Sequence, residues 1–280
     1  MTAAEFVYTV VLRPKPLKAM ANAAICRCIP ARVERHGATI VLNQKDAVVS
    51  GAIALGVYER AETAFFCGVC RPGMTFLDIG ANIGYYSALA SGRIGPQGRI
   101  VALEPDPENF RYLQQNMAAN RAPNAVCIPK AAAAESGTLQ LYINRENRGD
   151  NRLYANDLCD SSYQVEVSTV DAMLEDCGVE RVDLVKIDVQ GFEGHVLRGM
   201  KKTIQRSENL ILLTEFWPFG LRSAGTSPED LLEEMEQADL RLYELTAKGR
   251  LEHLTDKRAF IDRHPGRKYV NIVAARSTDL

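Results

Sequence analysis

An apolar run that ends in a glycine-containing turn constrains this chain more than any other feature. Residues 75–79 are apolar almost throughout, which is typical of a strand buried on both faces of a parallel sheet. Gly80 and Gly84 follow, with Ala81 and Asn82 between them, and a helix is predicted after Gly84. A strand, a glycine turn and a helix in this order let the backbone pass close to a bound nucleoside.

Short apolar runs and amphipathic segments alternate on both sides of this turn. Helices are predicted at residues 60–70, 108–120 and 193–203, and another begins where Ser227 caps Pro228. Strands that alternate with helices are typical of a doubly wound α/β sheet. Seven strands are predicted, at residues 75–79, 99–103, 125–129, 184–189, 210–216, 240–245 and 269–275.

Three regions are predicted along the chain. Residues 1–50 form an N-terminal appendage with basic residues and three prolines, and residues 51–280 form the main domain. A solvated basic face is expected on the appendage, with a peripheral membrane or partner contact as the alternative. Residues 137–170 form a strand-rich insertion, which is expected to choose the substrate. Its polar segment 147–156 is expected either to close over that substrate or to be a mobile surface loop.

Charge and hydropathy exclude several classes of protein. The chain of 280 residues has 33 basic and 35 acidic residues, so its formal net charge is −2. This balance argues against a nucleic-acid partner, because binding to phosphates needs clustered Lys and Arg. No run reaches the roughly 18 apolar residues of a membrane span, and the apolar stretch 6–12 lacks the basic region of a secretory signal. A cytoplasmic location is therefore expected.

Seven cysteines raise the question of a metal site. Cys26, Cys28, Cys67 and Cys70 are spaced closely in two pairs, and four thiolates can hold a structural zinc ion. Reduced, buried cysteines are the more common alternative in a cytosolic protein. We therefore expect that these cysteines bind no metal ion and that no metal takes part in the functional site.

Carboxylates at the ends of three predicted strands indicate the kind of ligand. Asp78 lies two residues before Gly80, and the turn has the form G-x-x-x-G rather than the G-x-G-x-x-G of dinucleotide-binding proteins. An acid at this position suits a ligand with ammonium and sulfonium charges better than a pyrophosphate. S-adenosylmethionine is such a ligand. Glu104, followed by Pro105, is placed to accept hydrogen bonds from ribose hydroxyls, although a strand-end acid can also cap the next helix.

The third acid, Asp188, lies near the end of the predicted strand that also contains Lys186. Asp188 can hold the methionine amino group, orient the methyl acceptor or bind a cation. Lys186 lies two positions earlier on the same face of the strand, so a structural ion pair with Asp188 is an equal alternative to a catalytic role.

Together these residues resemble the FkbM family of S-adenosylmethionine-dependent methyltransferases. The resemblance covers roughly residues 46–219 and rests on four ordered motifs, at 56–59, 77–86, 104–105 and 186–193. It implies a class I methyltransferase fold, which is a Rossmann-like sheet of seven strands with the last strand antiparallel. It also implies methyl transfer to oxygen, commonly a hydroxyl of a sugar, glycolipid or secondary metabolite.

The resemblance also implies residue roles. Glu104 would hold the ribose hydroxyls, Asp188 would line the methionine side, and Glu59 would close the amino-acid end. Ala131, in the run 129–132, would contact the adenine through its backbone. The whole set expected at the cofactor is Glu59, Asp78, Gly80, Ala81, Asn82, Gly84, Tyr86, Glu104, Pro105, Ala131 and Asp188.

Methyl transfer needs alignment of two substrates and removal of one proton, so the acceptor side should carry a base. The candidates are Asp188, His195 and Glu215, and Glu215 is preferred because it lies at the tip of a strand. Lys186 completes the set of candidate catalytic residues. The run 217–219, Trp-Pro-Phe, is either an apolar platform for the acceptor or packing at the edge of the sheet.

Two rival functions remain open at this point. One is a nucleic-acid or protein methyltransferase of the same fold, although the turn after Asp188 lacks the Asn/Asp-Pro-Pro-Tyr/Phe pattern of enzymes that methylate adenine or guanine nitrogens. The other is a non-catalytic module that binds a nucleoside, which the acids at three strand tips disfavour. The residues indicate neither the acceptor nor an oligomeric state.

Overall fold

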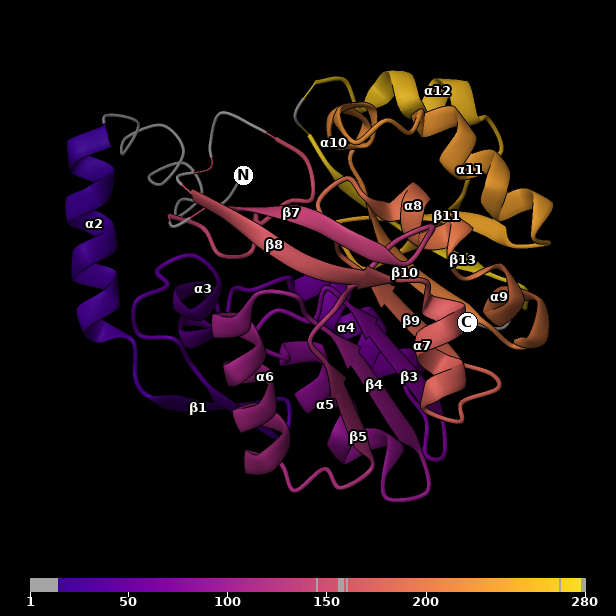
Figure 1. The fold of residues 1–280 in the computed structure, drawn as a ribbon. Coiled ribbons are helices and arrows are strands. Elements are labelled where there is room, and N and C mark those ends of the chain that lie inside the picture. The colour runs from indigo at the N-terminus through magenta and orange to yellow at the C-terminus, as the bar shows by residue number, and fades with distance from the viewer. Residues whose placement is uncertain (1–14, 145, 156–158, 160, 267, 278–280) are drawn as a thin grey trace.

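A computed structural model of the chain describes residues 15–144, 146–155, 159, 161–266 and 268–277. A central sheet has the strand order β12-β11-β13-β10-β9-β3-β4-β5 (Figure 1). The strands are β3 (Thr75–Ile79), β4 (Arg99–Leu103), β5 (Ala125–Ile128), β9 (Leu184–Ile187), β10 (Ile211–Phe216), β11 (Arg241–Leu245), β12 (Leu251–His253) and β13 (Val270–Ala275).

The direction of the strands confirms the predicted doubly wound sheet. Strands β5, β4, β3, β9 and β10 are parallel, and β13 is inserted antiparallel between β10 and β11. The seven predicted strands are all present. The short strand β12 pairs antiparallel with β11 and adds an eighth strand that the sequence did not predict.

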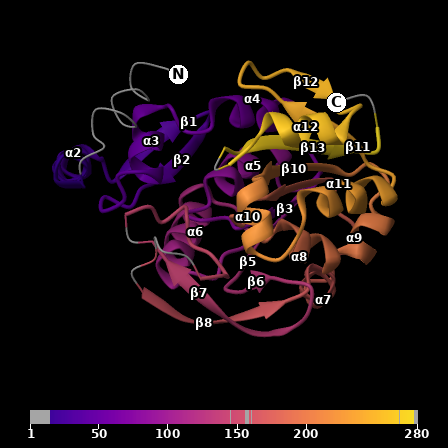
Figure 2. The same cartoon turned by 90° about the horizontal axis from the view of Figure 1, so that it is seen from above.

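Helices cover both faces of the sheet, as Figure 2 shows from above. Alternate side chains of each parallel strand enter two separate cores, so that Phe76 and Leu77 of β3 belong to different clusters. The Phe76 core includes side chains of α4 (Arg60–Val69), α5 (Tyr85–Ile94) and α6 (Pro107–Ala119). The Leu77 core includes side chains of α7 (Val170–Asp176), α8 (Glu193–Arg198), α9 (Lys201–Arg206), α10 (Pro218–Ser223), α11 (Pro228–Gln237) and α12 (Lys257–Arg263).

One predicted helix, 193–203, is wrong in its extent, because α8 and α9 are two helices with Gly199 and Met200 between them. A Cβ atom on Gly199 would lie 2.1 Å from the Ala133 carbonyl oxygen. Asp171 accepts hydrogen bonds from the backbone N–H groups of Lys202 and Thr203. Its carboxylate thus caps the N-terminus of α9 as a separate helix. The break therefore results from a tertiary contact and a cap that comes from another helix.

The N-terminal region comprises α2 (Lys15–Cys28), β1 (Arg32–Arg35), β2 (Ala38–Val41) and α3 (Val49–Leu55). The β1–β2 hairpin packs on α6, where Asn116 accepts the Val41 N–H at 2.6 Å and Asn120 accepts the Thr39 N–H at 2.9 Å. The predicted boundary at residue 50 falls within α3. The division into appendage and main domain stays a prediction, as does the peripheral contact of this region. No helix in the described ranges is long and apolar enough to cross a membrane.

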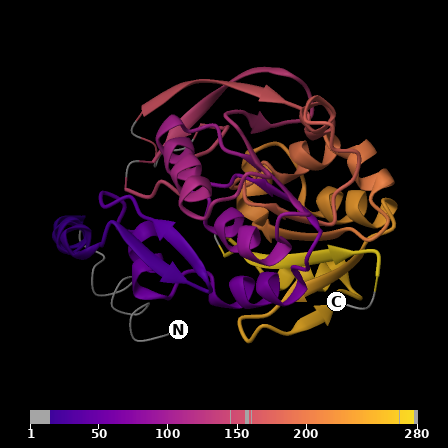
Figure 3. The same ribbon diagram turned by 90° about the horizontal axis from the view of Figure 1, so that it is seen from below.

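The region predicted as an insertion contributes to a second, three-stranded sheet. Its strands are β6 (Ala131–Ala132), β7 (Gly137–Ile143) and β8 (Ser161–Ser168), in the order β6-β8-β7. Figures 2 and 3 show this sheet as a separate layer along one side of the molecule. The chain after β7 turns back, and Tyr142 pairs with Arg152.

Candidate active site

A cavity of about 1220 Å³ lies at the carboxyl ends of β3, β4, β9 and β10. This is the edge of an open α/β sheet where ligands bind. Apart from Gly84 and the candidate base His195, the sequence-predicted site residues all line the cavity: Glu59, Asp78, Gly80, Ala81, Asn82, Tyr86, Glu104, Pro105, Ala131, Lys186, Asp188 and Glu215.

The turn after β3 brings two strand ends very close together. A Cβ atom on Gly80 would lie only 2.0 Å from the Asp188 carbonyl oxygen, and the φ of Gly80 is +79°. Asn82 also has a left-handed φ of 53°. Only glycine fits at position 80, because both the space and the backbone conformation exclude a side chain.

Gly84 has a different role from the one predicted. It does not line the cavity, and a Cβ atom on it would lie 2.6 Å from Cδ1 of Leu113 in α6. The glycine lets α5 pack closely on α6. The predicted contact with a cofactor is therefore not supported at this residue.

Glu104 follows β4 and is held by the backbone. Its Oε2 accepts the Asn82 N–H at 2.8 Å, and its Oε1 accepts the Asp106 N–H at 2.9 Å. Burial raises the pKa of Glu104 to about 8, although the backbone hydrogen bonds oppose the shift. The carboxyl group is therefore fixed in direction, and no salt bridge with a described Lys or Arg helps to keep it ionised.

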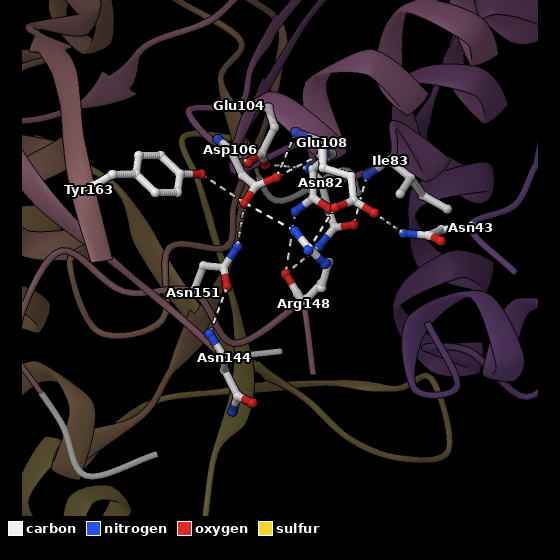
Figure 4. A network of polar contacts seen from close by, with 11 residues as sticks. Asn43, Asn82, Ile83, Glu104, Asp106, Glu108, Asn144, Arg148, Asn151 and Tyr163 are labelled. Atoms are coloured by element: carbon white, nitrogen blue, oxygen red, sulfur yellow. Dashed lines mark hydrogen bonds and ion pairs between the residues drawn. The ribbon is translucent and has the colours of Figure 1, made fainter. Parts of the chain in front are cut away.

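Residues of the loop that follows β7 contact this end of the cavity, and Figure 4 shows the polar network that Arg148 and Asn151 form there. Arg148 places Nη2 2.6 Å from Glu108 Oε2 and Nη1 3.4 Å from Asp106 Oδ2. Its carbonyl oxygen accepts the Asn82 side-chain amide at 3.2 Å, and Tyr163 donates to Asp106 at 2.9 Å. The loop therefore contacts the predicted ribose site.

The segment 147–156 was expected to close over the acceptor or to be a mobile surface loop. Its residues Asn147, Arg148, Gly149 and Asn151 line the cavity, and the hydrogen bonds of Arg148 attach the segment near Glu104. Residue 156 lies outside the described residues. Arg148 is thus a site residue that the sequence analysis did not name. The residues next to it form no motif that would indicate a role for this arginine.

Lys186 is the cation at the centre of the cavity's acidic end. Its Nζ lies 2.8 Å from Asp188 Oδ2, 3.9 Å from Glu59 Oε2 and 4.6 Å from the centre of the Tyr86 ring. Burial opposes its charge, but Asp188, Glu59 and Asp78 together raise the pKa of Lys186 above its usual value. The structural ion pair that the sequence left as an alternative is therefore present.

Asp78 and Glu59 are buried with hydrogen-bonded neighbours. Asp78 accepts the Ser87 hydroxyl at 2.7 Å, and Glu59 accepts the Tyr86 hydroxyl at 2.6 Å. Burial raises the pKa of Asp78 to about 6, against the opposing effect of Lys186. Burial likewise raises the pKa of Glu59. The end of the cavity around these two acids thus holds more potential negative charge than Lys186 balances.

The candidate bases have different surroundings. Both carboxylate oxygens of Asp188 are engaged, Oδ2 by Lys186 and Oδ1 by the Gln190 amide at 2.8 Å. Oε2 of Glu215 is buried and has no hydrogen-bond partner among the described residues. Burial, followed by the charges of Asp188 and Glu193, raises the pKa of Glu215 well above its usual value. Of Asp188 and Glu215, Glu215 is therefore the acid that keeps a carboxyl oxygen without a hydrogen-bond partner among the described residues.

His195 and the run 217–219 lie elsewhere. The His195 ring stacks on Phe192, its Nε2 contacts the Ala224 carbonyl oxygen at 2.9 Å, and it does not line the cavity. Trp217 packs against Arg152, 4.7 Å from ring centre to guanidinium carbon, and the run is likewise absent from the cavity lining. The contacts of His195 and Trp217 therefore favour packing over the predicted roles of a base and an apolar platform.

The cysteines show no metal site. No group of three or more His, Cys, Asp or Glu side chains within the described ranges is placed to hold a metal ion. Burial raises the pKa of Cys70 to about 11, which disfavours the thiolate form that binds zinc. The zinc interpretation of Cys26, Cys28, Cys67 and Cys70 therefore has no supporting cluster in that part of the chain.

Comparison with known proteins adds a family to this geometry. A family model described as "Methyltransferase FkbM domain" matches residues 78–242. Hexuronic acid methyltransferase AglP of Haloferax volcanii is 27% identical over 163 residues, which are 58% of this chain and 62% of that protein. Methyltransferase sdnD of Sordaria araneosa is 29% identical over 176 residues, 52% of this chain and 68% of that protein.

One further relative and one solved structure are also similar to this chain. The 2-O-methyltransferase NoeI of Sinorhizobium fredii is 25% identical over 161 residues, 52% of this chain and 64% of that protein. A crystal structure of methyltransferase FkbM from Methylobacillus flagellatus aligns with a TM-score of 0.44 and 14% identity, covering 96% of this chain and 60% of that one. The matched segments thus span about two thirds or less of the relatives AglP and NoeI.

Proposed function

Because the family model covers more than half of its residues, this chain belongs to the FkbM family of S-adenosylmethionine-dependent methyltransferases, and we propose that it methylates a hydroxyl oxygen. The enzyme has the class I methyltransferase fold, with S-adenosylmethionine as its cofactor. The proposed acceptors are sugars, glycolipids and secondary metabolites. The observation that carries the proposal is that Glu215 lines the cavity and that its buried Oε2 has no hydrogen-bond partner among the described residues.

The residues of the cavity fit this cofactor. S-adenosylmethionine supplies a methyl group on a positively charged sulfur when it is bound. Asp78, Glu59 and Asp188 surround a single cation, Lys186, so this end of the cavity suits a ligand with ammonium and sulfonium charges. We assign the methionine end to these acids.

The nucleoside end is assigned to the turn after β3 and to Glu104. The two backbone hydrogen bonds of Glu104 fix its carboxyl group, which has further lone pairs for the ribose hydroxyls. Pro105 and Ala131 also line the cavity and are proposed to contact the adenine. Gly80 keeps the two strand ends close enough for both regions to face one ligand.

Glu215 is proposed as the base. A hydroxyl group must lose its proton as its oxygen accepts the methyl group, and a positioned carboxylate with a raised pKa can take that proton. Asp188 is less suited, since Lys186 and Gln190 already bind both of its oxygens. We therefore propose that Asp188 and Lys186 position the methionine end, whereas Glu215 acts on the acceptor.

The relatives support oxygen as the acceptor atom. AglP is named a hexuronic acid methyltransferase and NoeI a 2-O-methyltransferase. The matches cover 62% of AglP and 64% of NoeI, so the chemistry of this chain needs its own test.

The test is transfer of a labelled methyl group from S-adenosylmethionine to a panel of uronic acids, glycosides, glycolipids and hydroxylated aromatic compounds, with RNA, DNA and a protein mixture as comparison substrates. We expect the label in a methyl ether, identified by mass spectrometry and by the carbon chemical shift of the O-methyl group. Glu215→Gln should bind the cofactor as wild type does and transfer no measurable label. Label that enters only RNA, DNA or protein would show that the proposed acceptor class is wrong.

A further inference from the structure

The cavity continues beyond the acids toward α3 and the start of α4. Around α3 its lining is apolar and includes Val48, Val49, Ala52, Leu55 and Val57, whereas Arg60 and Glu62 at the start of α4 are charged. The whole cavity, about 1220 Å³, is larger than the roughly 300–1,000 Å³ of most small-molecule sites. The apolar part is therefore a region that the cofactor and a small polar acceptor together need not fill.

Exposed apolar side chains are concentrated at this cavity. Among the described residues, four large apolar side chains are exposed, and three of them line the cavity: Leu55 (71%), Val57 (52%) and Tyr269 (62%). The fourth, Phe219, does not line it. Single exposed apolar residues need no explanation, but their clustering around one opening marks a binding surface.

The apolar side chains stand on a turn that is held rigidly. Gly56 ends α3 with a φ of 69°, and its N–H donates to the carbonyl oxygens of α3. The Arg35 guanidinium in β1 also donates to the Ile53 carbonyl oxygen at 3.0 Å and binds one further carbonyl oxygen, that of Ala54, at 2.6 Å. Leu55 and Val57 therefore project from a fixed position beside the cavity. We call Ala52, Leu55 and Val57 the apolar shelf.

We propose that the apolar shelf binds an apolar portion of the methyl acceptor, an acyl chain or hydrophobic ring system attached to the part that carries the reacting hydroxyl. The shelf and Glu215 line the same cavity, so one amphiphilic molecule reaches both. Burial of the apolar portion against Leu55 and Val57 removes apolar surface of both partners from water. This inference rests on the proposed hydroxyl methylation and specifies the class of acceptor: an amphiphile rather than a free sugar.

A matched pair of probes tests the shelf without turnover. Octyl β-D-glucoside and methyl β-D-glucoside share a sugar and differ only in the alkyl chain. Their binding is measured by titration calorimetry to protein saturated with S-adenosylhomocysteine, below the concentration at which the octyl compound forms micelles. We expect the octyl probe to bind at least about tenfold more tightly than the methyl probe, since each buried methylene contributes to affinity.

Substitutions test whether the apolar shelf causes the tighter binding of the octyl probe. The double substitution Leu55→Asn and Val57→Asn should abolish the preference for the octyl probe and leave the affinity for S-adenosylhomocysteine unchanged. Phe219→Asn removes an exposed apolar side chain outside the cavity and should keep the preference. Because both substituted shelf residues are already exposed, the fold should tolerate the change, and unchanged cofactor affinity reports that it does.

Several results would overturn the proposal. An equal affinity for the two probes, or an octyl preference that survives the double substitution, shows that the shelf does not bind the acceptor. Binding to vesicles of phosphatidylcholine and phosphatidylglycerol, or a dimer seen by light scattering, that the double variant loses without any change in probe preference assigns the shelf to a membrane or to a second copy. Failure of the proposed function is distinct, because there the methyl label enters no hydroxylated acceptor whichever probe binds.

Discussion

The ammonium group of Lys186 lies 2.8 Å from Asp188 Oδ2, at the carboxyl end of the central strand β9. Glu59 and Asp78 face the same cation, and burial opposes the charge of these two acids and of Lys186. Such a cluster is stable only while opposite charges remain together. Lys186 therefore holds the acids of the methionine end in place before any ligand enters.

Replacing Lys186 with methionine should destabilise the fold. The substitution keeps the length of the side chain but leaves buried carboxylates without their cation, a change that typically costs about 3–5 kcal/mol. We expect a loss of this size in the free energy of unfolding, measured by urea denaturation at pH 8. The double variant Lys186→Met with Asp188→Asn also removes one of the carboxylates that lose their cation. It should therefore recover part of the lost free energy of unfolding. Equal stability of the single and double variants would contradict this account.

Asp78 should matter for the cofactor more than for the fold. Asp78→Asn removes a negative charge from the methionine end while preserving the shape and the contact with Ser87. We expect the affinity for S-adenosylmethionine, measured by calorimetry, to fall by at least about tenfold, or roughly 1.4 kcal/mol. Asp176→Asn makes the same change of charge on the exposed end of α7 and serves as the control. An unchanged affinity in Asp78→Asn would remove Asp78 from the proposed cofactor site.

The parts of this fold that the sequence predicted are those with a local pattern. The strand, turn and helix around Gly80 each follow from a few neighbouring residues, and so do the strand ends at Glu104 and Asp188. Parallel strands bring their carboxyl ends to one edge of the sheet, so these acids were expected to meet there without any knowledge of side-chain contacts. The structure places them in one cavity.

The sequence-based predictions fail where contacts between residues far apart in the sequence determine the local structure. Gly84 looks like part of a binding turn, but the neighbour that requires its small size is Leu113 in another helix. The break at Gly199 depends on Ala133, and the position of Arg148 depends on Asp106 and Glu108. His195 was a plausible base by residue type alone, and only the packing of α8 turns its ring onto Phe192.

Glu104 should make stability depend on pH. Its pKa in the folded protein is about 8, above its usual value of 4.5, so the folded state holds the proton more tightly than the unfolded state. The stability from this group is fully present below about pH 4.5 and is lost as the pH rises to about 8. Glu104→Gln stays neutral throughout. We therefore expect the Tm of the variant, relative to wild type, to rise between pH 5 and pH 8.5 in ligand-free protein. A difference in Tm that stays constant over this range would contradict the raised pKa.

Arg148 should control how fast the cofactor leaves. Its contacts with Asp106 and Glu108 attach the loop of the second sheet to the nucleoside end of the cavity. Arg148→Ala removes both contacts, and we expect a several-fold faster dissociation of S-adenosylhomocysteine in stopped-flow experiments. Arg111→Ala removes an exposed arginine from α6, the helix that contains Glu108, and should leave the rate unchanged. If Arg148→Ala dissociates the ligand at the wild-type rate, the loop does not retain the cofactor.

Glu215 should govern turnover without governing cofactor binding. Glu215→Gln preserves the size of the side chain but cannot accept a proton, so kcat with a hydroxylated acceptor should fall by about 10²–10⁴. The Kd for S-adenosylmethionine should stay within about twofold of wild type, because the acids assigned to the methionine end remain. Burial raises the pKa of Glu215, and the base must be ionised to act, so the wild-type kcat should rise with pH until that carboxyl group is fully ionised. The variant should lose this rising limb. A variant with wild-type kcat and the same pH profile would transfer the role of base to another group, with Asp188 the first to test.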